Sequence, residues 1–401
     1  MADADPADLA EPGAAATPSA TRIWIERLQL TSFRNYASLA LSVGAAPVVL
    51  TGANGSGKTN LLEALSLLTS GQGLRRAPFP ELARLGSASW AVAARLQTPL
   101  GPVDLGTGVV AEADAGGRTG RIVRIDGETQ SGSGALADHV EMVWLTPAMD
   151  GLFTGPASER RRFLDRLISG LDPNYRSLLG QFERAMQQRN RLLADDVRDG
   201  VRFEGFERIM AEAGVAIAAA RAVAVAELSA AIGARRDAAR GALFPWAELA
   251  LEGMLESALA SRPAIDVEDD YSGLLGSERE RDRAAGRTLE GPHRSDLVVG
   301  HGPKDLPAKV CSTGEQKALL IGLVLAHCDL VGRRRDGAAP VLLLDEIAAH
   351  LDAARRAALF EEVVAMGSQT WMSGTDREAF AALGDRAQFC RVEDGRIVPS
   401  R

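Results

Sequence analysis

The sequence predicts an α/β fold in which a head of mixed and parallel sheet carries an inserted, mainly helical lobe. Residues 47–51, PVVLT, form a short apolar run before a glycine-rich loop and an apolar helical stretch, the pattern of a buried strand followed by a helix. Residues 340–374 alternate strand, helix and strand, an order typical of a parallel sheet covered by helices. Between these regions, from 157 to about 259, apolar residues recur at helical spacing.

Length and composition are those of an ordinary globular protein. The 401 residues allow two or three domains, and 46% apolar with 24% charged residues is usual for a folded chain. The net charge of -8 argues against a broad polybasic surface but leaves room for a local one. Only four of the 45 basic residues are lysines, so a motif that requires lysine stands out.

The cysteines and the N-terminal residues indicate the cellular compartment. Cys311, Cys328 and Cys390 are odd in number and widely spaced, so they suggest neither a disulfide framework nor a zinc site, and a reducing, cytoplasmic location is expected. Residues 1–20 are acidic and rich in proline and alanine, which predicts a disordered tail rather than a secretory signal. Because no stretch approaches about 18 uninterrupted apolar residues, no membrane span is expected.

The first third of the chain predicts a mixed sheet around one helix. Residues 23–43 alternate apolar and polar side chains on either side of the turn SFRNY, which is typical of half-buried strands. Further strands are expected at 90–97, 121–126 and 141–146, between glycine-rich turns. Together with the strand at 47–51 and the helix after it, these segments form one half of the head.

The middle of the chain predicts a helical lobe. Strand signals vanish from 157 to about 259, and the apolar spacing indicates two long amphipathic helices, near 175–193 and 206–228. An extended coiled coil is disfavoured because alanine fills many of the seam positions. The expected units are a tail at 1–20, a head at 21–155 and 285–401, and an inserted lobe at 156–284.

The loop after the first buried strand fits a phosphate-binding motif. Residues 52–59, GANGSGKT, match G-x-x-x-x-G-K-[ST] between a strand and a helix. Such a loop turns its backbone N–H groups around phosphate oxygens, so Lys58 is expected to reach the β and γ phosphates of ATP and Thr59 to ligate Mg²⁺. A glycine-rich turn with a solvated lysine is the alternative. The expected nucleotide-binding residues are Gly52, Ala53, Asn54, Gly55, Ser56, Gly57, Lys58 and Thr59.

A second part of a nucleotide site follows a buried strand late in the chain. The segment PVLLLDEIAAHLD at 340–352 places Asp345 directly after four apolar residues, where a carboxylate can hold Mg²⁺ beside the phosphate loop. Glu346, the next residue, is the candidate catalytic base that polarises the attacking water, with Lys58 as its catalytic partner. The alternative is an ordinary solvated strand end that carries two acids.

The segment STGEQK at 312–317 precedes an apolar helix. Ser312 or Thr313 can cap that helix and Gly314 allows close approach of the backbone, so the segment suits an anion at a helix N-terminus. By itself, a plain N-cap without a ligand is the simpler interpretation. The position of the segment, 33 residues before Asp345, favours the anion site.

The order of these motifs is similar to that of the ABC-type ATPases. The phosphate loop, the signature segment STGEQK, the acidic strand end and the sequence His-Leu-Asp follow one another as in that class. The resemblance implies a dimer in which the signature helix of one subunit closes over the nucleotide held by the other. At the switch position, where transporters usually have histidine, this chain has Ser373 to Thr375. The resemblance places Ser312, Thr313, Gly314 and Glu315 at the nucleotide of the partner subunit. It makes His350, Leu351 and Asp352 the loop across the dimer seam, with Asp352 among the nucleotide-binding residues.

The chain resembles one branch of this class more closely. Its opening segment LQLTSFRNYASLAL resembles SMC-like DNA-repair ATPases, in which Arg34 would sit near the nucleotide. Ser312 follows Lys58 by 254 positions, a spacing too long for a compact transporter subunit. Motifs of the RecF family of bacterial recombination mediators occur in order from about 25 to 392, namely FRNY, GANGSGKTN, GPASERRRFLD, GPHRSDL, STGEQK and LLLDEIAAHLD.

The resemblance to the RecF family implies an ATP-dependent DNA-binding protein of recombinational repair, replication restart and the SOS response. Such a protein would dimerise on binding ATP at duplex DNA near single-strand gaps, contact single-stranded DNA, and act with RecR and RecO to help load RecA. Weak, DNA-stimulated ATP hydrolysis would reopen the dimer. Two alternatives stay open, the ATPase subunit of a membrane transporter and a nucleotide-dependent interaction module without meaningful turnover.

Arginine clusters are the candidate contacts to DNA phosphates. Taken singly, each cluster is more simply interpreted as a solvated helix face or as an internal salt bridge. The clusters are Arg75 and Arg76, Arg160 to Arg162, Arg189 and Arg191, Arg235 and Arg236, and Arg333 to Arg335.

Overall fold

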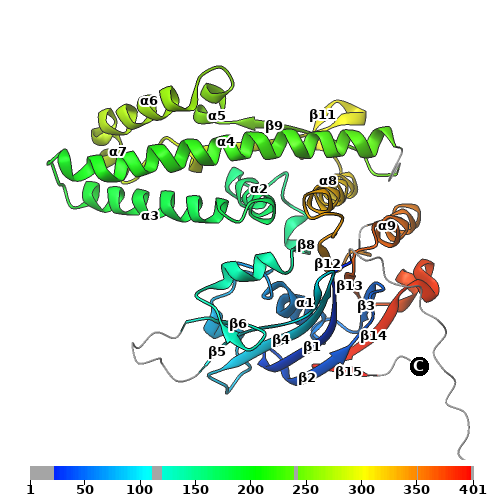
Figure 1. The fold of residues 1–401 in the computed structure, drawn as a ribbon. Coiled ribbons are helices and arrows are strands. Elements are labelled where there is room, and N and C mark those ends of the chain that lie inside the picture. The colour runs from blue at the N-terminus through cyan, green and yellow to red at the C-terminus, as the bar shows by residue number, and fades with distance from the viewer. Residues whose placement is uncertain (1–21, 111–119, 239–242, 350, 399–401) are drawn as a thin grey trace, which may run out of the picture.

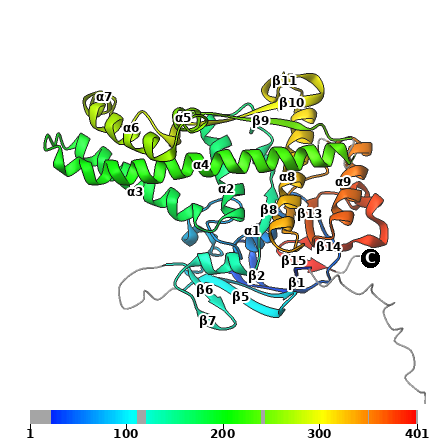
Figure 2. The same ribbon diagram turned by 45° about the horizontal axis from the view of Figure 1, so that its top comes forward.

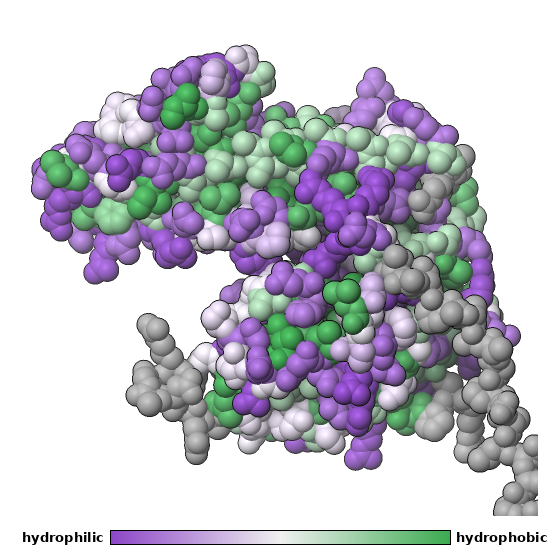
Figure 3. All heavy atoms as spheres, viewed as in Figure 1, coloured by the Kyte–Doolittle hydropathy of each residue, from purple (hydrophilic) through white to green (hydrophobic). Residues whose placement is uncertain are grey.

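The chain forms two tiers, a head built on sheets and a helical lobe above it (Figure 1). The computed structural model describes residues 22–110, 120–238, 243–349 and 351–398. The tail expected at 1–20 lies outside the described residues. A space-filling view shows that the helical lobe overhangs the head and leaves a hollow between the two tiers on one side (Figure 3).

The first sheet of the head is antiparallel and half buried. Its strand order is β2-β1-β4-β5-β6-β7, and alternate residues of β1 and β4 are buried, because successive side chains of a strand point to opposite faces. The strands are β1 (Trp24–Phe33), β2 (Tyr36–Ser42), β4 (Trp90–Thr98), β5 (Gly101–Val109), β6 (Ile122–Ile125) and β7 (Glu128–Thr129).

The second sheet carries the motifs and is mostly parallel. Its order is β15-β14-β3-β13-β12-β8, with parallel pairing from β14 through to β8. Every residue of β3, β8, β12 and β13 is buried. Burial on both faces explains why β8 and β12 are continuous apolar runs, whereas β13 has the mixed sequence TWMSG. The strands are β3 (Val48–Thr51), β8 (Met142–Leu145), β12 (Val341–Leu344), β13 (Thr370–Gly374), β14 (Gln388–Glu393) and β15 (Arg396–Val398).

Helix α1 (Lys58–Ser66) joins the two sheets into one core. Leu61 and Leu62 of this helix are fully buried in the same cluster as Leu28 of β1 and Leu50 of β3. The buried apolar area fixes the start of α1, and therefore the phosphate loop, between the sheets. Helix α9 (Ala353–Met366) packs beside the second sheet (Figure 1).

The lobe consists of long helices and one small sheet (Figure 2). Its helices are α2 (Ala157–Leu171), α3 (Tyr175–Ala194), α4 (Val201–Asp237), α5 (Met254–Leu259), α6 (Ala264–Ser277) and α7 (Arg279–Ala285). The sheet has the order β11-β10-β9, made of β9 (Ala247–Glu252), β10 (Asp296–His301) and β11 (Leu306–Pro307).

The prediction that strands are absent from 157 to about 259 is wrong at β9. The segment AELALE buries alternate residues and pairs antiparallel with β10. Its partner comes more than forty residues later in the chain, and a short alanine-containing run gives no decisive periodicity without it. Strands that follow residue 285 thus pair with a strand from the middle of the chain.

Helix α4 is the central element of the lobe. Among the described residues it alone is long and apolar enough to cross a membrane, with a mean hydropathy of 1.8 in its most apolar window, but half of that window is buried inside the protein. Met210, Ala218 and Ala231 are at most 1% exposed and pack in the same core as helix α8 (Thr313–Arg334). This burial is typical of the core helix of a globular protein.

Candidate nucleotide-binding site

The phosphate loop leads from β3 into α1 and depends on glycine conformations. Gly52, Gly55 and Gly57 have φ of 150°, 83° and 118°, a region that side chains disfavour. A Cβ at Gly52 would lie 2.2 Å from the carbonyl oxygen of Val392, so the loop touches the end of β14. A Cβ at Gly55 would meet no atom within 4 Å, which leaves the tip of the loop open to a ligand.

The turn between β1 and β2 supports the loop from the other side. Asn35 Nδ2 donates to Ser56 O at 3.0 Å, and the Tyr36 hydroxyl donates to Gly57 O at 3.1 Å. Sequence reasoning missed both supporting residues, although their position in the FRNY motif marks them. Arg34, which the resemblance places near the nucleotide, pairs with the buried Glu63 of α1, with two nitrogen–oxygen distances of 2.9 Å.

Lys58 is held inside the loop. Its Nζ donates to Gly52 O at 2.7 Å and to Ala53 O at 3.0 Å, and it lies 3.4 Å from Glu346 Oε1. The Ser56 hydroxyl is buried, and no described residue offers it a hydrogen-bond partner. A flexible ammonium and an unpartnered hydroxyl suit phosphate oxygens, which accept hydrogen bonds from both.

The acidic end of β12 meets the start of α1. Thr59 Oγ1 donates to Asp345 Oδ1 at 2.9 Å, so residues 286 positions apart form one oxygen cluster. Mg²⁺ prefers oxygen ligands and commonly uses one carboxylate together with substrate phosphates and water. Thr59 and Asp345 therefore fit the expected metal site. Among the described residues no group of three or more His, Cys, Asp or Glu side chains forms a further metal site.

Ser373 at the end of β13 connects the two acids. Its Oγ donates to Asp345 Oδ1 at 2.7 Å and accepts from the backbone N–H of Glu346 at 2.8 Å. Glu346 has a φ of 48°, an unusual conformation for a residue with a side chain, and such conformations persist where neighbours hold them. Ser373 thus fixes Glu346 beside Lys58, a role that the sequence marked only as an unusual switch position.

If Glu346 is the catalytic base that the sequence predicts, replacing Ser373 by alanine is expected to slow ATP hydrolysis by about tenfold to a hundredfold, because small misplacements of such a group are costly. ATP affinity should change much less, since the phosphate loop is intact. Steady-state hydrolysis and equilibrium binding of a fluorescent ATP analogue separate the two effects. Ser277→Ala is the matched control, because Ser277 is exposed on α6, far from the phosphate loop in the sequence, and its hydroxyl donates to the carbonyl of Leu274 in its own helix. Unchanged hydrolysis in Ser373→Ala would show that Ser373 does not position Glu346.

The signature segment forms a capping box at the start of α8. Ser312 Oγ accepts from the N–H of Glu315, while the Glu315 carboxylate accepts from the N–H of Ser312. Lys304 Nζ lies 2.5 Å from Glu315 Oε1. This ion pair and the Ser312 hydrogen bonds lower the pKa of Glu315 to about 2. Sequence reasoning did not predict the contact with Lys304.

The motifs expected to act in trans are not joined to the phosphate loop of their own chain. The hydrogen bonds and ion pairs of Ser312 and Glu315 stay within the segment or go to Lys304 across the part of the chain that is described. Asp352 caps α9 by accepting from the N–H of Arg355 at 2.8 Å. His350 lies outside the described residues.

Several of the arginines considered as DNA contacts are held by acids of the same chain. Arg160 pairs with Asp296 at 2.7 Å, and Arg334 pairs with Glu227 at 2.5 Å. Arg235 pairs with Asp329 and Glu362, and Arg189 is fully buried between Glu207 and Asp282. The charges of these arginines are paired within the chain, as the internal salt-bridge interpretation predicts.

Comparisons with known proteins agree over nearly the whole chain. The family model described as RecF/RecN/SMC N terminal domain matches residues 24–387. The DNA replication and repair protein RecF of Mesorhizobium japonicum is 52% identical over 377 residues, which cover 94% of this chain and 98% of the relative. The protein of the same name from Allorhizobium ampelinum is 52% identical over 381 residues, which cover 94% of this chain and 99% of the relative.

Solved structures confirm the expected fold class. The recombination mediator protein RecF-ATPrS in the RecFOR pathway superposes with a TM-score of 0.80 at 21% identity, over 94% of this chain and 98% of that chain. A Smc head domain derived from Pyrococcus furiosus gives a TM-score of 0.52 at 18% identity, over 94% of this chain and 96% of that chain. The architecture is therefore that of an α/β ATPase head with an inserted lobe. With the family model and two relatives at 52% identity covering almost all of it, the chain belongs to the RecF family.

Proposed function

We propose that the protein binds ATP and Mg²⁺ and uses them to control its binding to DNA in replication and recombinational repair. The observation that carries this proposal is the assembly of Lys58, Thr59, Asp345, Glu346 and Ser373 at one phosphate loop, from three separate parts of the chain. Membership of a family whose relatives are called DNA replication and repair proteins supports the DNA part.

The residues of this site have distinct roles in the proposal. Lys58, now bonded to two loop carbonyls, would turn its ammonium to the β and γ phosphates. Thr59 and Asp345 would hold Mg²⁺, which neutralises negative charge on the phosphates when bound. Glu346, positioned by Ser373, would accept a proton from the attacking water. Each role uses a group that already lies within hydrogen-bond or ion-pair reach of its neighbours.

A second copy of the chain would complete the site. We infer that Ser312, Thr313, Gly314 and Glu315 of one subunit, with Asp352, close over the nucleotide held by the other. Ser312 and Thr313 at the N-terminal end of α8 are exposed, and a helix N-terminus favours an anion. ATP would stabilise the closed dimer and slow hydrolysis would release it, so nucleotide shifts a two-state equilibrium.

The proposed partners follow from the family. A solved relative is described as part of the RecFOR pathway, and on that basis we propose that this protein acts with RecR and RecO near single-strand gaps and helps to load RecA. The net charge of -8 excludes a generally positive surface, so the contact with DNA is expected on one face that the closed dimer assembles.

Sedimentation with gapped duplex DNA tests the proposed function. We expect co-sedimentation with ATP and Mg²⁺ and little without nucleotide, because the binding face requires two subunits. Affinity should fall roughly a thousandfold as salt rises from about 50 to about 200 mM, since phosphate contacts release counterions. Fully duplex DNA and single-stranded DNA of equal length are the controls for the gap. Equal binding with and without ATP would contradict the proposal.

A further inference from the structure

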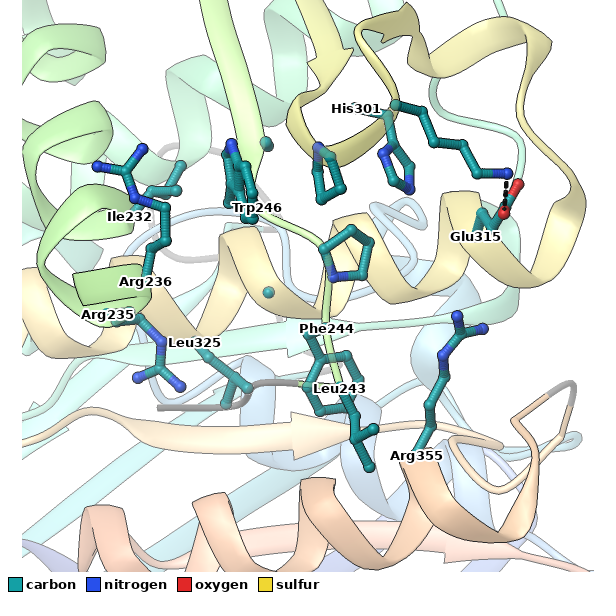
Figure 4. Close-up of a pocket in the computed structure, with 15 residues that line it drawn as sticks. Ile232, Arg235, Arg236, Leu243, Phe244, Trp246, His301, Glu315, Leu325 and Arg355 are labelled. Atoms are coloured by element: carbon teal, nitrogen blue, oxygen red, sulfur yellow. Dashed lines mark hydrogen bonds and ion pairs between the residues drawn. The ribbon is translucent and has the colours of Figure 1, made fainter. Parts of the chain in front are cut away.

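A cavity of about 450 Å³ lies where α4, α8, α9 and the strand β10 meet (Figure 4). Its volume falls within the range of about 300–1,000 Å³ that is usual for small-molecule sites. The cavity is separate from the phosphate loop, since residues 52–59 do not line it. The ATP site described above therefore makes no use of it.

One wall of the cavity is aromatic and rigid. Phe244 and Trp246 line it together with Leu325 of α8. The indole of Trp246 lies so close to Gly302 that a Cβ there would come within 1.8 Å of the indole nitrogen, and the N–H of Gly302 donates to Trp246 O at 3.0 Å. This close approach fixes the ring at the edge of the cavity, where it can stack on a flat ligand.

The rest of the lining is rich in cations. Arg236, Lys304 and Arg355 border the cavity from three different segments, and Figure 4 shows Arg355 reaching toward it from α9. Their side chains are 48%, 48% and 29% exposed, and each has an acid partner at the surface. Because exposed ion pairs are weak, these cations can turn to an anionic ligand. Among the described residues that line the cavity, Glu315 is the one carboxylate.

Arg235 and His301 place two polar side chains in the lining of the cavity. Arg235 is immobilised by Asp329 at 2.6 Å and by Glu362 at 2.5 Å. His301 also lines the cavity, is 4% exposed, and has a buried Nδ1 that bonds to no described residue. A buried polar atom without a partner is uncommon in folded proteins.

We propose that this cavity binds a small aromatic anion, that is, a flat ring system that carries a carboxylate, sulfonate or phosphate group. The ring would stack on Trp246 in place of the Arg236 guanidinium, which lies over the indole at 5.6 Å from the ring centre. The anionic group would face Arg236, Lys304 and Arg355. The combination of an apolar wall with several converging cations recognises both halves of such a molecule.

A ligand there would act on the two segments that are expected to contact a partner's nucleotide. Lys304 holds Glu315 of the signature segment, and Arg355 lies 3.7 Å from Asp352. An anion that draws Lys304 and Arg355 into the cavity frees Glu315 and Asp352 at the same time. Ligand binding and ATP-driven closure are then coupled, and this coupling rests on the proposed function.

Binding of 8-anilinonaphthalene-1-sulfonate to the full-length protein without nucleotide tests the site. This probe carries an aromatic system and one anionic group, and its fluorescence rises in apolar surroundings. Arg236→Ala and Arg355→Ala should each weaken its binding by about tenfold, the effect of losing one hydrogen bond to a charged group. The uncharged analogue N-phenyl-1-naphthylamine should bind weakly and respond to neither substitution.

Arg95→Ala is the matched control, because Arg95 is 51% exposed and forms a comparable surface pair with Asp104 on the head. Circular dichroism verifies that each variant is folded. Equal affinity of the sulfonate probe for wild type and both pocket variants would overturn the proposal. Equal affinity for the charged and uncharged probes would also overturn it.

The coupling is tested by repeating the titration with ATP and Mg²⁺. Since coupling between sites is reciprocal, ATP should change the affinity for the probe about fivefold or more in wild type and leave it unchanged in Lys58→Ala. No change in wild type would overturn the coupling, provided that ATP binding is seen directly. Failure of ATP to bind would contradict the proposed function instead. The probe affinities measured without nucleotide would still test whether the cavity binds an aromatic anion.

Discussion

Lys58→Ala is expected to lose ATP binding and ATP-dependent dimerisation together, whereas Glu346→Gln should still bind ATP and accumulate as a closed dimer. Lys58 supplies the cation at the phosphate loop, 4% exposed and bonded to loop carbonyls that ATP would replace as partners. Glutamine keeps the size of Glu346 but cannot accept a proton, so hydrolysis should fall by about a hundredfold or more. Analytical ultracentrifugation with ATP and Mg²⁺ reports the dimer.

Glu128→Gln is the control for the removal of one carboxylate, because Glu128 is exposed on the short edge strand β7 of the head. It should behave as wild type in binding, hydrolysis and sedimentation. A monomeric Glu346→Gln protein at saturating ATP and Mg²⁺ would rule out the closed sandwich. An interaction module without turnover predicts instead that Glu346→Gln and wild type sediment alike at all times.

Arg189→Leu is expected to destabilise the helical lobe by about 3–5 kcal/mol. The guanidinium is 0% exposed and contacts Glu207 at 3.1 Å, Asp282 at 2.6 Å and the carbonyl of Leu275 at 2.7 Å. Removing it leaves the buried Asp282 without its cation and leaves Glu207 with Arg279 alone, which is the costly way to break a buried ion pair. Urea unfolding followed by circular dichroism at 222 nm measures the loss, since the lobe holds most of the long helices.

Arg191→Leu is the matched control on the same helix. Its side chain is 77% exposed and lies 4.0 Å from Asp195, so the change in unfolding free energy should stay within about 0.5 kcal/mol. If Arg189→Leu is too unstable to purify, Arg279→Leu gives a milder test, because Arg279 is 24% exposed and pairs with Glu207 alone in this network. Equal stability of Arg189→Leu and wild type would contradict the predicted role.

The sequence predicts best where local pattern and burial agree. The strands β3 and β12 are buried on both faces. Their residues are therefore mostly apolar, and this pattern predicts buried strands from the sequence alone. The glycines of the phosphate loop are equally visible, because only glycine adopts those backbone angles without strain. The motif order then predicted the α/β head with an inserted lobe, which the comparison with solved RecF and Smc heads confirms.

Long-range pairing accounts for what the sequence did not predict. Strand β5 has a glycine-rich, weakly apolar sequence, GPVDLGTGV, and forms because β4 and β6 pair with its two edges. In the sequence, Arg189 cannot be distinguished from an exposed arginine of an amphipathic helix. Asp282, one of its two acid partners, comes 93 residues later. The bridge that Ser373 makes to Asp345 likewise appears only when two parallel strands lie side by side.

The 37-residue helix α4 has a mechanical consequence. At about 1.5 Å per residue it is a rigid rod about 55 Å long. Near its C-terminal end Arg235 ties it to Asp329 of α8 and Glu362 of α9, while its other end carries α3 and α6 away from the head (Figure 1). A rotation of about 10° at the tied end would move the far end of α4 by about 10 Å. A small rearrangement of α8 and α9 would therefore produce a large displacement of α3 and α6.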